Sequence, residues 1–367
     1  MTIIIFFSLI FLIAIVVCVF IRQPKFGKHP VGERLERVKK SPYYRDGSFK
    51  NVTPTPQLTE GVTYYKAFKD FFFGKKIRII PNGQIPSVKT NLLNLDIHKD
   101  VLVWFGHSSY FIQIDEKRIL VDPVFCGHAS PFSFSVKAFK GTDIYTTEEI
   151  PSIDYLFITH DHWDHLDEKT IKKIKPKIKT AICSLGTGEH LEYWGYDKSK
   201  IIELDWNENV VLDKDFKVNA TAARHFSGRT FIRNKALWTS FVLQTPTMKI
   251  FLGGDSGYDV HFAEIGKTFD FFDLAILENG QYDWKWKYIH SSPEEVLKAA
   301  KDLNAKRIFP VHNSKFALAS HPWDEPLEKI TTYNKTENLN LITPMIGEQV
   351  NLKDNTQIFT EWWKAVK

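Results

Sequence analysis

The sequence predicts an α/β sandwich of stacked layers, preceded by a transmembrane helix. Short apolar strands come first and then alternate with helices, and the pattern recurs in the second half of the 367-residue chain. Polar side chains that can carry chemistry follow directly after several of these strands. An apolar run at the N-terminus is long enough to cross a bilayer.

The composition is that of a globular protein. Hydrophobic residues make up 43% and charged residues 25%, which excludes intrinsic disorder and fibrous repeats. The net charge of +5 suits an anionic surface, but no basic-aromatic nucleic-acid module is visible, so we expect no nucleic-acid partner. The chain has three cysteines, Cys18, Cys126 and Cys183. Cys18 lies in the apolar N-terminal run, which excludes a disulfide framework, and no two cysteines are close together, which excludes a cysteine-based zinc finger.

The N-terminal run, residues 3–21, is apolar except for Ser8 and Cys18 and would form a helix roughly 30 Å long. It lacks the basic start and the cleavage site of a signal peptide, and it is apolar all round, unlike a buried amphipathic helix. Basic residues follow it: Arg22, Lys25, Lys28, Arg34, Arg37, Lys39 and Lys40. The positive-inside rule therefore predicts a single-pass membrane protein with a cytoplasmic catalytic domain. The basic cluster also suits anionic lipid headgroups.

We expect three segments: a transmembrane anchor over 1–22, a basic linker and wrapping arm over 23–95, and a folded domain over 96–367. Predicted strands in that domain cover 101–105, 110–114, 118–121, 155–159, 180–183, 216–223, 237–244, 248–252, 272–277 and 306–311. Predicted helices cover 168–174 and 186–194, and a third starts at Ser292, where proline and two acids mark the first turn.

The sharpest motif follows the strand 155–159 and holds His160, Asp161, His162, Asp164 and His165. In an extended or turning backbone, residues two apart point to the same side, so the first two histidines can bind one ion. Asp164 and His165 can turn to a second ion. Imidazole nitrogen and carboxylate oxygen suit zinc, and also iron or manganese in mixed sites.

Three further candidates each follow a predicted strand: His225, Asp255 and His312. A strand before every candidate places these side chains at one edge of the sheets. Gly253 and Gly254 precede Asp255 and allow the backbone to approach a metal centre closely.

With these residues the sequence resembles the metallo-β-lactamase superfamily, whose signature is His-x-His-x-Asp-His followed by spaced His, Asp and His. The resemblance implies a four-layer αββα fold over 96–367 and a centre of two divalent ions, taken here as zinc. It assigns His160, His162 and His225 to one ion. It assigns Asp164, His165 and His312 to the other, with Asp255 bridging the two ions.

A narrower resemblance covers about residues 100–345. The collinear segments 104–107, 122–125, 129–131, 203–206, 254–258, 264–267 and 316–321 resemble the N-acyl-phosphatidylethanolamine-hydrolysing phospholipase D family. This resemblance implies that Trp163, His290 and His321 contact substrate, with Trp163 standing where that family has tyrosine. It makes Asp255 and His290 catalytic, and it implies a homodimer.

Three more residues are expected behind the ligands. His107 lies in a segment that carries the resemblance, and Asp122 and Asp161 can fix the tautomers of ligand imidazoles. Ordinary turn polarity is the alternative for the two aspartates. Phe125, Phe132, Phe134 and Phe139 crowd one loop and predict an apolar entry for acyl chains, with core packing as the alternative.

The expected function is that of a membrane-anchored di-metal phosphodiesterase acting on phospholipid. Hydroxide held by both ions would attack phosphorus and release N-acylethanolamine and phosphatidic acid, as the resemblance implies. One alternative is a hydrolase or lactonase of a soluble phosphorylated substrate, which needs no anchor. Another is a metal-binding membrane scaffold, against which seven ligands with a bridging carboxylate argue.

Overall fold

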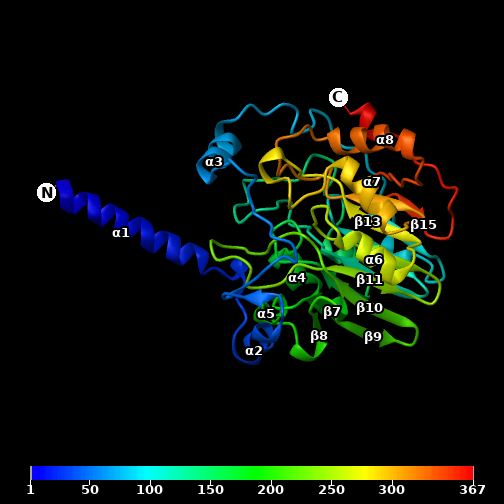
Figure 1. Ribbon diagram of the computed structural model, residues 1–367, viewed down its shortest axis with the longest axis horizontal. Coiled ribbons are helices and arrows are strands. Elements are labelled where there is room, and N and C mark those ends of the chain that lie inside the picture. The colour runs from blue at the N-terminus through cyan, green and yellow to red at the C-terminus, as the bar shows by residue number, and fades with distance from the viewer. Residues whose placement is uncertain (1, 367) are drawn as a thin grey trace.

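A computed structural model describes residues 2–366 of the chain (Figure 1). Its α-helices are α1 Thr2–Ile21, α2 Gly32–Lys40, α3 Tyr64–Phe73, α4 Glu168–Ile174, α5 Gly188–Tyr193, α6 His261–Phe269, α7 Pro293–Asp302 and α8 Glu325–Glu337. The strands of the first half are β1 Tyr44–Arg45, β2 Ser48–Phe49, β3 Val101–Trp104, β4 Tyr110–Ile114, β5 Lys117–Val121, β6 Ile153–Ile158 and β7 Ile178–Ser184. Those of the second half are β8 Ile201–Leu204, β9 Asn209–Asp213, β10 Phe216–Thr221, β11 Ser240–Gln244, β12 Lys249–Leu252, β13 Leu274–Glu278, β14 Ile308–Val311 and β15 Gln349–Asn351.

Two large sheets form the centre of the fold. One has seven strands in the order β15-β3-β4-β5-β6-β7-β8, and the other has six in the order β14-β13-β12-β11-β10-β9. In each sheet, antiparallel hairpins lead into parallel strands, with β5 to β8 parallel in the first and β12 to β14 in the second. The sequence pattern of hairpins followed by strand-helix alternation therefore matches the topology.

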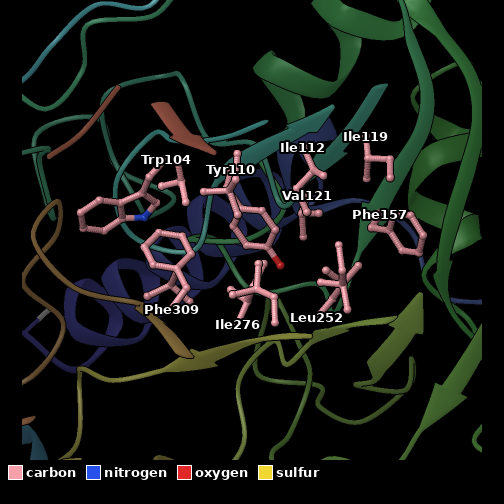
Figure 2. Close-up of a cluster of buried hydrophobic side chains, with 14 of the residues drawn as sticks. Trp104, Tyr110, Ile112, Ile119, Val121, Phe157, Leu252, Ile276 and Phe309 are labelled. Carbon is pink, nitrogen blue, oxygen red and sulfur yellow. The ribbon is translucent and has the colours of Figure 1, made fainter. Parts of the chain in front are cut away.

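Successive side chains of a strand alternate between the two faces of its sheet. Tyr155 and Phe157 of β6 pack into the core between the sheets, whereas Leu156 and Ile158 pack on the outer face, where α4 and α5 also contribute. Figure 2 shows the inner core, in which Tyr110 and neighbouring side chains of one sheet meet Leu252, Ile276 and Phe309 of the other.

A third cluster covers the outer face of the six-stranded sheet. Leu277 of β13 packs there with Phe262 of α6, Val296 of α7 and Ile330 of α8. Helices thus cover both outer faces of a pair of stacked sheets. This confirms the four-layer αββα sandwich, and burial on both faces explains why the strands are almost continuously apolar.

Helix α1 projects from the sandwich as a separate rod (Figure 1). Its window Ile4–Ile21 has a mean hydropathy of 3.4, and the helix is long and apolar enough to cross a membrane. The segment 22–95, which follows α1 in the chain, runs along the sandwich. Arg34 of α2 forms ion pairs with the buried Glu189 and Glu203, and Phe49 of β2 is fully buried.

Candidate metal centre

The candidate site lies at one edge of the sandwich, where seven strands deliver polar side chains at their carboxyl ends. These residues are His107 after β3, Asp122 after β5, the motif 160–165 after β6, His225 after β10, Asp255 after β12, Glu278 at the end of β13 and His312 after β14. Within each sheet, those of these seven strands that belong to it run in the same direction, so their carboxyl ends lie at the same edge.

The backbone at this edge is held in unusual conformations. His107, Asp122 and His312 have φ angles of 53°, 41° and 67°, a left-handed region that costs a non-glycine residue about 1–3 kcal/mol. Two crossed hydrogen bonds support it: the His107 N–H donates to the Asn313 carbonyl and the His312 N–H to the His107 carbonyl, both at 3.0 Å. These bonds join the edges of the two sheets.

Gly254 allows the close approach of two backbone segments that the sequence predicts. Its φ is +60°, and a Cβ at this position would lie 2.9 Å from the Cβ of Thr159, the residue before the histidine motif. A side chain there would push apart the two loops that carry His160 and Asp255. Glycine is therefore required for the site to close.

The first cluster joins three imidazoles. Nε2 of His160 lies 2.9 Å from Nδ1 of His162, and Nε2 of His225 lies 3.2 Å from the same Nδ1. Oδ2 of Asp255 lies 3.8 Å from His160 Nε2 and 3.7 Å from His225 Nε2. One atom from each of these four residues lies within 4.8 Å of the others, a spacing that suits a single ion.

The second cluster lies beside the first. Oδ2 of Asp164 is 3.1 Å from His312 Nε2 and 3.5 Å from His165 Nε2. Asp255 reaches this cluster as well, with Oδ1 3.2 Å from His165 Nε2 and Oδ2 3.2 Å from His312 Nε2. All seven predicted ligands therefore converge, and the Asp255 carboxylate lies between the two groups, where the resemblance placed it.

The donor set fits divalent metal ions. Burial lowers the pKa of His160 well below its usual value and the pKa of His162 and of His225 to about 3, so these imidazoles are neutral near pH 7. Neutral imidazole is the form that binds metal. The buried atoms His165 Nε2 and Asp255 Oδ1 lack any hydrogen-bond partner among the described residues. They lie 3.2 Å from each other, next to the other candidate ligand atoms. Such unsatisfied buried atoms are costly unless an ion binds them.

Two of the three residues expected behind the ligands contact them. Oδ2 of Asp122 lies 2.8 Å from Nδ1 of His165, and Nε2 of His107 lies 2.9 Å from Oδ2 of Asp164. Asp122 orients His165 from the far side of its ring, as outer carboxylates do at metal centres. His107 instead contacts the Asp164 oxygen that faces His165 and His312, and it lies close enough to these three residues to be a further candidate ligand.

Asp161 differs from the expectation. Its Oδ2 lies 3.2 Å from Nε2 of His190 and its Oδ1 accepts a hydrogen bond from the Gly228 N–H, and no hydrogen bond joins its carboxylate to a predicted ligand. The reason is alternation: where His160 and His162 point into the centre, the residue between them points away. Asp161 instead anchors the loop 228–229.

A cavity of about 720 Å³ leads from the centre, within the roughly 300–1,000 Å³ typical of ligand pockets. Trp163 and His290, two of the three predicted substrate contacts, line it together with His162, Asp255 and His312. The remaining lining is mostly apolar and includes Phe26, Ala129, Phe132, Phe226, Phe231, Trp286, Ile289 and Leu318.

His321, the third predicted substrate contact, is not among the residues that line this cavity. Its Nε2 accepts a hydrogen bond from the Gln281 N–H, its Nδ1 lies 2.8 Å from the Pro322 carbonyl, and its ring stacks on Tyr282. Both ring nitrogens therefore bind the backbone, and a substrate contact by His321 stays a prediction. The histidine fixes the Gln281 loop, which does line the cavity.

Of the four phenylalanines expected to form an apolar entry, some pack in the core and others are exposed. Phe139 is buried in the core, and the half-buried Phe125 packs against Phe105. Phe132 and Phe134 are exposed, and Phe132 lines the cavity. The apolar entry therefore involves only part of the predicted set.

Sequence reasoning missed two residues of the site. Oε2 of the buried Glu278 lies 2.7 Å from Nδ1 of His290 and 3.4 Å from Nδ1 of His312. Its position at the end of β13 is the same signal that identified Asp255 and His312. The buried Arg229 places its guanidinium 3.9 Å from the centre of the Trp163 ring and donates to the carbonyls of Asp161 and Leu166. No local pattern marks that arginine.

Comparison with known proteins places this geometry in a family. Residues 117–313, more than half of the chain, match the family model described as the Beta-lactamase superfamily domain. The chain belongs to the beta-lactamase superfamily. It is also 33% identical over 328 residues to the uncharacterized protein Rv0906 of Mycobacterium tuberculosis, covering 88% of each chain.

Two further similarities extend this family assignment. The chain is 34% identical over 238 residues to the mitochondrial N-acyl-phosphatidylethanolamine-hydrolyzing phospholipase D of Saccharomyces cerevisiae, covering 62% of this chain and 50% of that protein. Its fold is similar to that of Igni18, a metallo hydrolase from Ignicoccus hospitalis, with a TM-score of 0.53, 19% identity, and coverage of 69% and 98%. As a member of the beta-lactamase superfamily with paired His/Asp clusters, the protein is a metal-dependent hydrolase.

Proposed function

We propose that this metal-dependent hydrolase is a membrane-anchored phosphodiesterase that cleaves N-acyl-phosphatidylethanolamine into N-acylethanolamine and phosphatidic acid. The observation that carries the proposal is the cavity, whose lining combines residues of the metal centre with mostly apolar side chains. A phospholipid has the matching arrangement, with an anionic phosphodiester beside long acyl chains. Similarity to the yeast phospholipase supports the same substrate class.

In the proposed site, His160, His162 and His225 would hold one ion and Asp164, His165 and His312 the other, with an oxygen of Asp255 within reach of each set. Two divalent ions, taken as Zn²⁺, would lower the pKa of water to supply a nucleophile near neutral pH and would offset charge on the phosphate oxygens. Asp122 holds His165 in position through its Nδ1, and the Ile289 carbonyl does the same for His225. Rigid support of this kind keeps the donor atoms aimed at one point.

His290 has a separate role in this proposal. The hydrogen bond between its Nδ1 and Glu278 fixes the ring and leaves Nε2 for the substrate. The ring lines the cavity beside His312 and His225, at 5.2 Å and 5.0 Å between ring centroids. Burial and Asp255 raise the pKa of Glu278 well above its usual value, so a protonated Glu278 can donate to Nδ1 and leave the imidazole proton on Nε2. In that form Nε2 can bind a phosphate oxygen or donate a proton to the leaving oxygen.

Helix α1 supplies the membrane attachment in this proposal, since its side chains from Ile4 to Val19 are exposed. The basic residues after it favour a cytoplasmic catalytic domain. The apolar cavity also favours lipid over the soluble phosphorylated substrate of the alternative function, because a sugar phosphate would leave this lining without a partner.

The test is product analysis by mass spectrometry on the full chain, loaded with Zn²⁺ in mixed micelles. N-acyl-phosphatidylethanolamine, phosphatidylethanolamine and a sugar-phosphate lactone are offered separately, with Asp255→Asn as the control. We expect N-acylethanolamine and phosphatidic acid from the first substrate and no product from the control. Turnover of the lactone without lipid cleavage would establish the alternative function, and two bound ions without any turnover would contradict both.

A further inference from the structure

The membrane helix α1 contributes to the cavity as well as extending away from the sandwich. Val17, Phe20 and Ile21, from its last turn and a half, line the same cavity as the metal-cluster residues His162 and Asp255. The cavity therefore connects the candidate metal centre with the end of the helix that is long and apolar enough to cross a membrane.

A continuous series of aromatic contacts fixes this end of α1 to the site. Phe20 stacks on Phe132 with ring centroids 4.9 Å apart and meets Phe26 edge-on at 5.3 Å. Phe26 in turn meets Trp163 edge-on at 5.2 Å, and Trp163 stands between the ligands His162 and Asp164. Such pairs are each worth about 0.5–1.5 kcal/mol beyond the area they bury.

Polar contacts at the helix end reinforce the aromatic ones. Nζ of Lys25 donates to the Pro131 carbonyl at 2.7 Å and lies 4.4 Å from the centre of the Phe20 ring. The carbonyl of Lys25 accepts hydrogen bonds from the buried Arg229 at 2.8 and 3.0 Å. The position of the last turn of α1 is therefore set by the catalytic domain.

The cavity reaches the protein surface at large apolar side chains. Phe231 is 85% exposed and Phe132 43% exposed, both line the cavity, and Phe132 stacks on Phe20 of α1. Ile232, which follows Phe231 in the chain, is also exposed, and Arg233 adds a positive charge to the cavity lining. Exposed aromatic and basic side chains next to a membrane helix suit the interfacial region of a bilayer.

We propose that the last turn and a half of α1 forms one wall of the lipid site, so that a phospholipid enters the cavity sideways from the bilayer along the helix. This inference rests on the proposed lipid substrate and adds that the helix is part of the binding site rather than only an anchor. A replacement of α1 by another membrane helix would then keep the protein at the membrane and still impair lipid turnover.

The test compares two substitutions of equal size in full-length protein reconstituted in phosphatidylcholine vesicles. Val17→Trp adds bulk on the cavity side, whereas Val19→Trp adds it at an exposed position that does not line the cavity. Turnover of N-acyl-phosphatidylethanolamine in the vesicles is measured beside that of bis(4-nitrophenyl) phosphate, a small soluble phosphodiester. We expect Val17→Trp to lower kcat/KM for the lipid about tenfold more than for the small diester, because the added ring displaces acyl methylenes. Val19→Trp should change neither. Equal effects of the two substitutions on lipid turnover would overturn the proposal.

A second readout separates this inference from the proposed substrate. A phosphatidylethanolamine with a diazirine on one acyl chain is photolysed in the same vesicles, and crosslinked peptides are identified by mass spectrometry. Crosslinks to the cavity-lining Phe226 and Leu318 that are lost in Val17→Trp and kept in Val19→Trp support the wall even if no N-acyl lipid is hydrolysed. Hydrolysis of the lipid with crosslinks confined to α1 would refute the wall and leave the proposed function standing.

Discussion

Nδ1 of His290 lies 2.7 Å from Oε2 of Glu278, a buried carboxylate at the end of β13 that also lies 3.4 Å from Nδ1 of His312. One side chain thus braces both the proposed substrate histidine and a candidate ligand. Its other oxygen accepts the Ser291 N–H at 2.9 Å, so the carboxylate itself is fixed. Glu278 is therefore a positioning residue for His290 and His312.

Glu278→Gln should lower kcat by about 10- to 100-fold, the usual effect of losing a partner behind a metal ligand. The amide keeps the size of the side chain but replaces the carboxyl group whose Oε2 contacts both histidines. Steady-state kinetics and metal content are measured together, with Glu264→Gln on the exposed face of α6 as the control. An unchanged kcat and metal content would show that Glu278 does not orient these imidazoles.

Asp255→Asn should reduce bound metal after dialysis and lower hydrolysis by at least about a hundredfold, more than the loss of an outer partner. Both oxygens of Asp255 face cluster nitrogens, at 3.2 Å from His165 and His312. An amide offers one oxygen and no charge, so it cannot serve two ions. Elemental analysis by mass spectrometry checks the metal content, and a variant that keeps two equivalents and full activity would contradict the bridging position.

Trp163→Ala should destabilise the protein by about 2 kcal/mol, below the roughly 3–5 kcal/mol of a fully buried tryptophan, because this ring is half-buried. The substitution removes the contacts with Phe26 and with Arg229. The melting temperature in detergent measures the effect. Trp284→Ala, at a ring that is 57% exposed, serves as the control and should have a much smaller effect. Equal melting temperatures for both variants would show that Trp163 makes no structural contribution.

Arg34→Ala should destabilise the protein by about 3 kcal/mol at pH 7, because it leaves the buried Glu189 and Glu203 without their shared cation. Burial raises the pKa of Glu189, but hydrogen bonds from Arg34 and Lys28 outweigh it and hold this pKa below its ordinary 4.5. Stability from a lowered carboxyl pKa is fully present above the unfolded value and is lost as the pH falls through the folded value.

The difference between wild type and Arg34→Ala should therefore be largest above pH 4.5 and shrink in more acidic solution. Urea unfolding at several pH values measures it. Arg37→Ala, which breaks an ion pair that is nearly half exposed on both sides, should cost less than about 1 kcal/mol. A pH-independent difference for Arg34→Ala would show that the carboxylates are not its cause.

The helices and strands that could be predicted from the sequence are those with a clear local pattern of apolar or capping residues. The predictions of a strand over 110–114 and a helix over 168–174 are confirmed to the residue, and Ser292 caps α7 as expected. Helices α6 and α8 are not among the predicted helices, and neither has a side chain that caps its first turn. The edge strand β9 also escapes prediction, because none of its residues is buried and it therefore lacks a buried apolar run.

The site divides in the same way. The candidate ligands could be predicted because each of them follows a strand that is itself recognisable as an apolar run in the sequence. The backbone contacts of His321 could not be predicted, because its partner, the Gln281 N–H, lies far away in the chain. The contact between Phe20 and Phe132 is likewise beyond any local pattern, so the sequence could predict an apolar helix long enough to cross a membrane, but not the contribution of its last turn to the cavity lining.

The crossed hydrogen bonds between His107 and the His312 loop have a consequence for the order of assembly. Each candidate ion draws donors from both sheets: His160 and His162 from one with His225 from the other, and His165 from one with His312 from the other. A nascent chain that has emerged only as far as β12 contains the histidines of the first candidate set but lacks Asp255, His312 and the strands β13, β14 and β15. Both candidate sets therefore stay incomplete until the last part of the chain has joined the two sheets, and a bound ion would then link one sheet to the other.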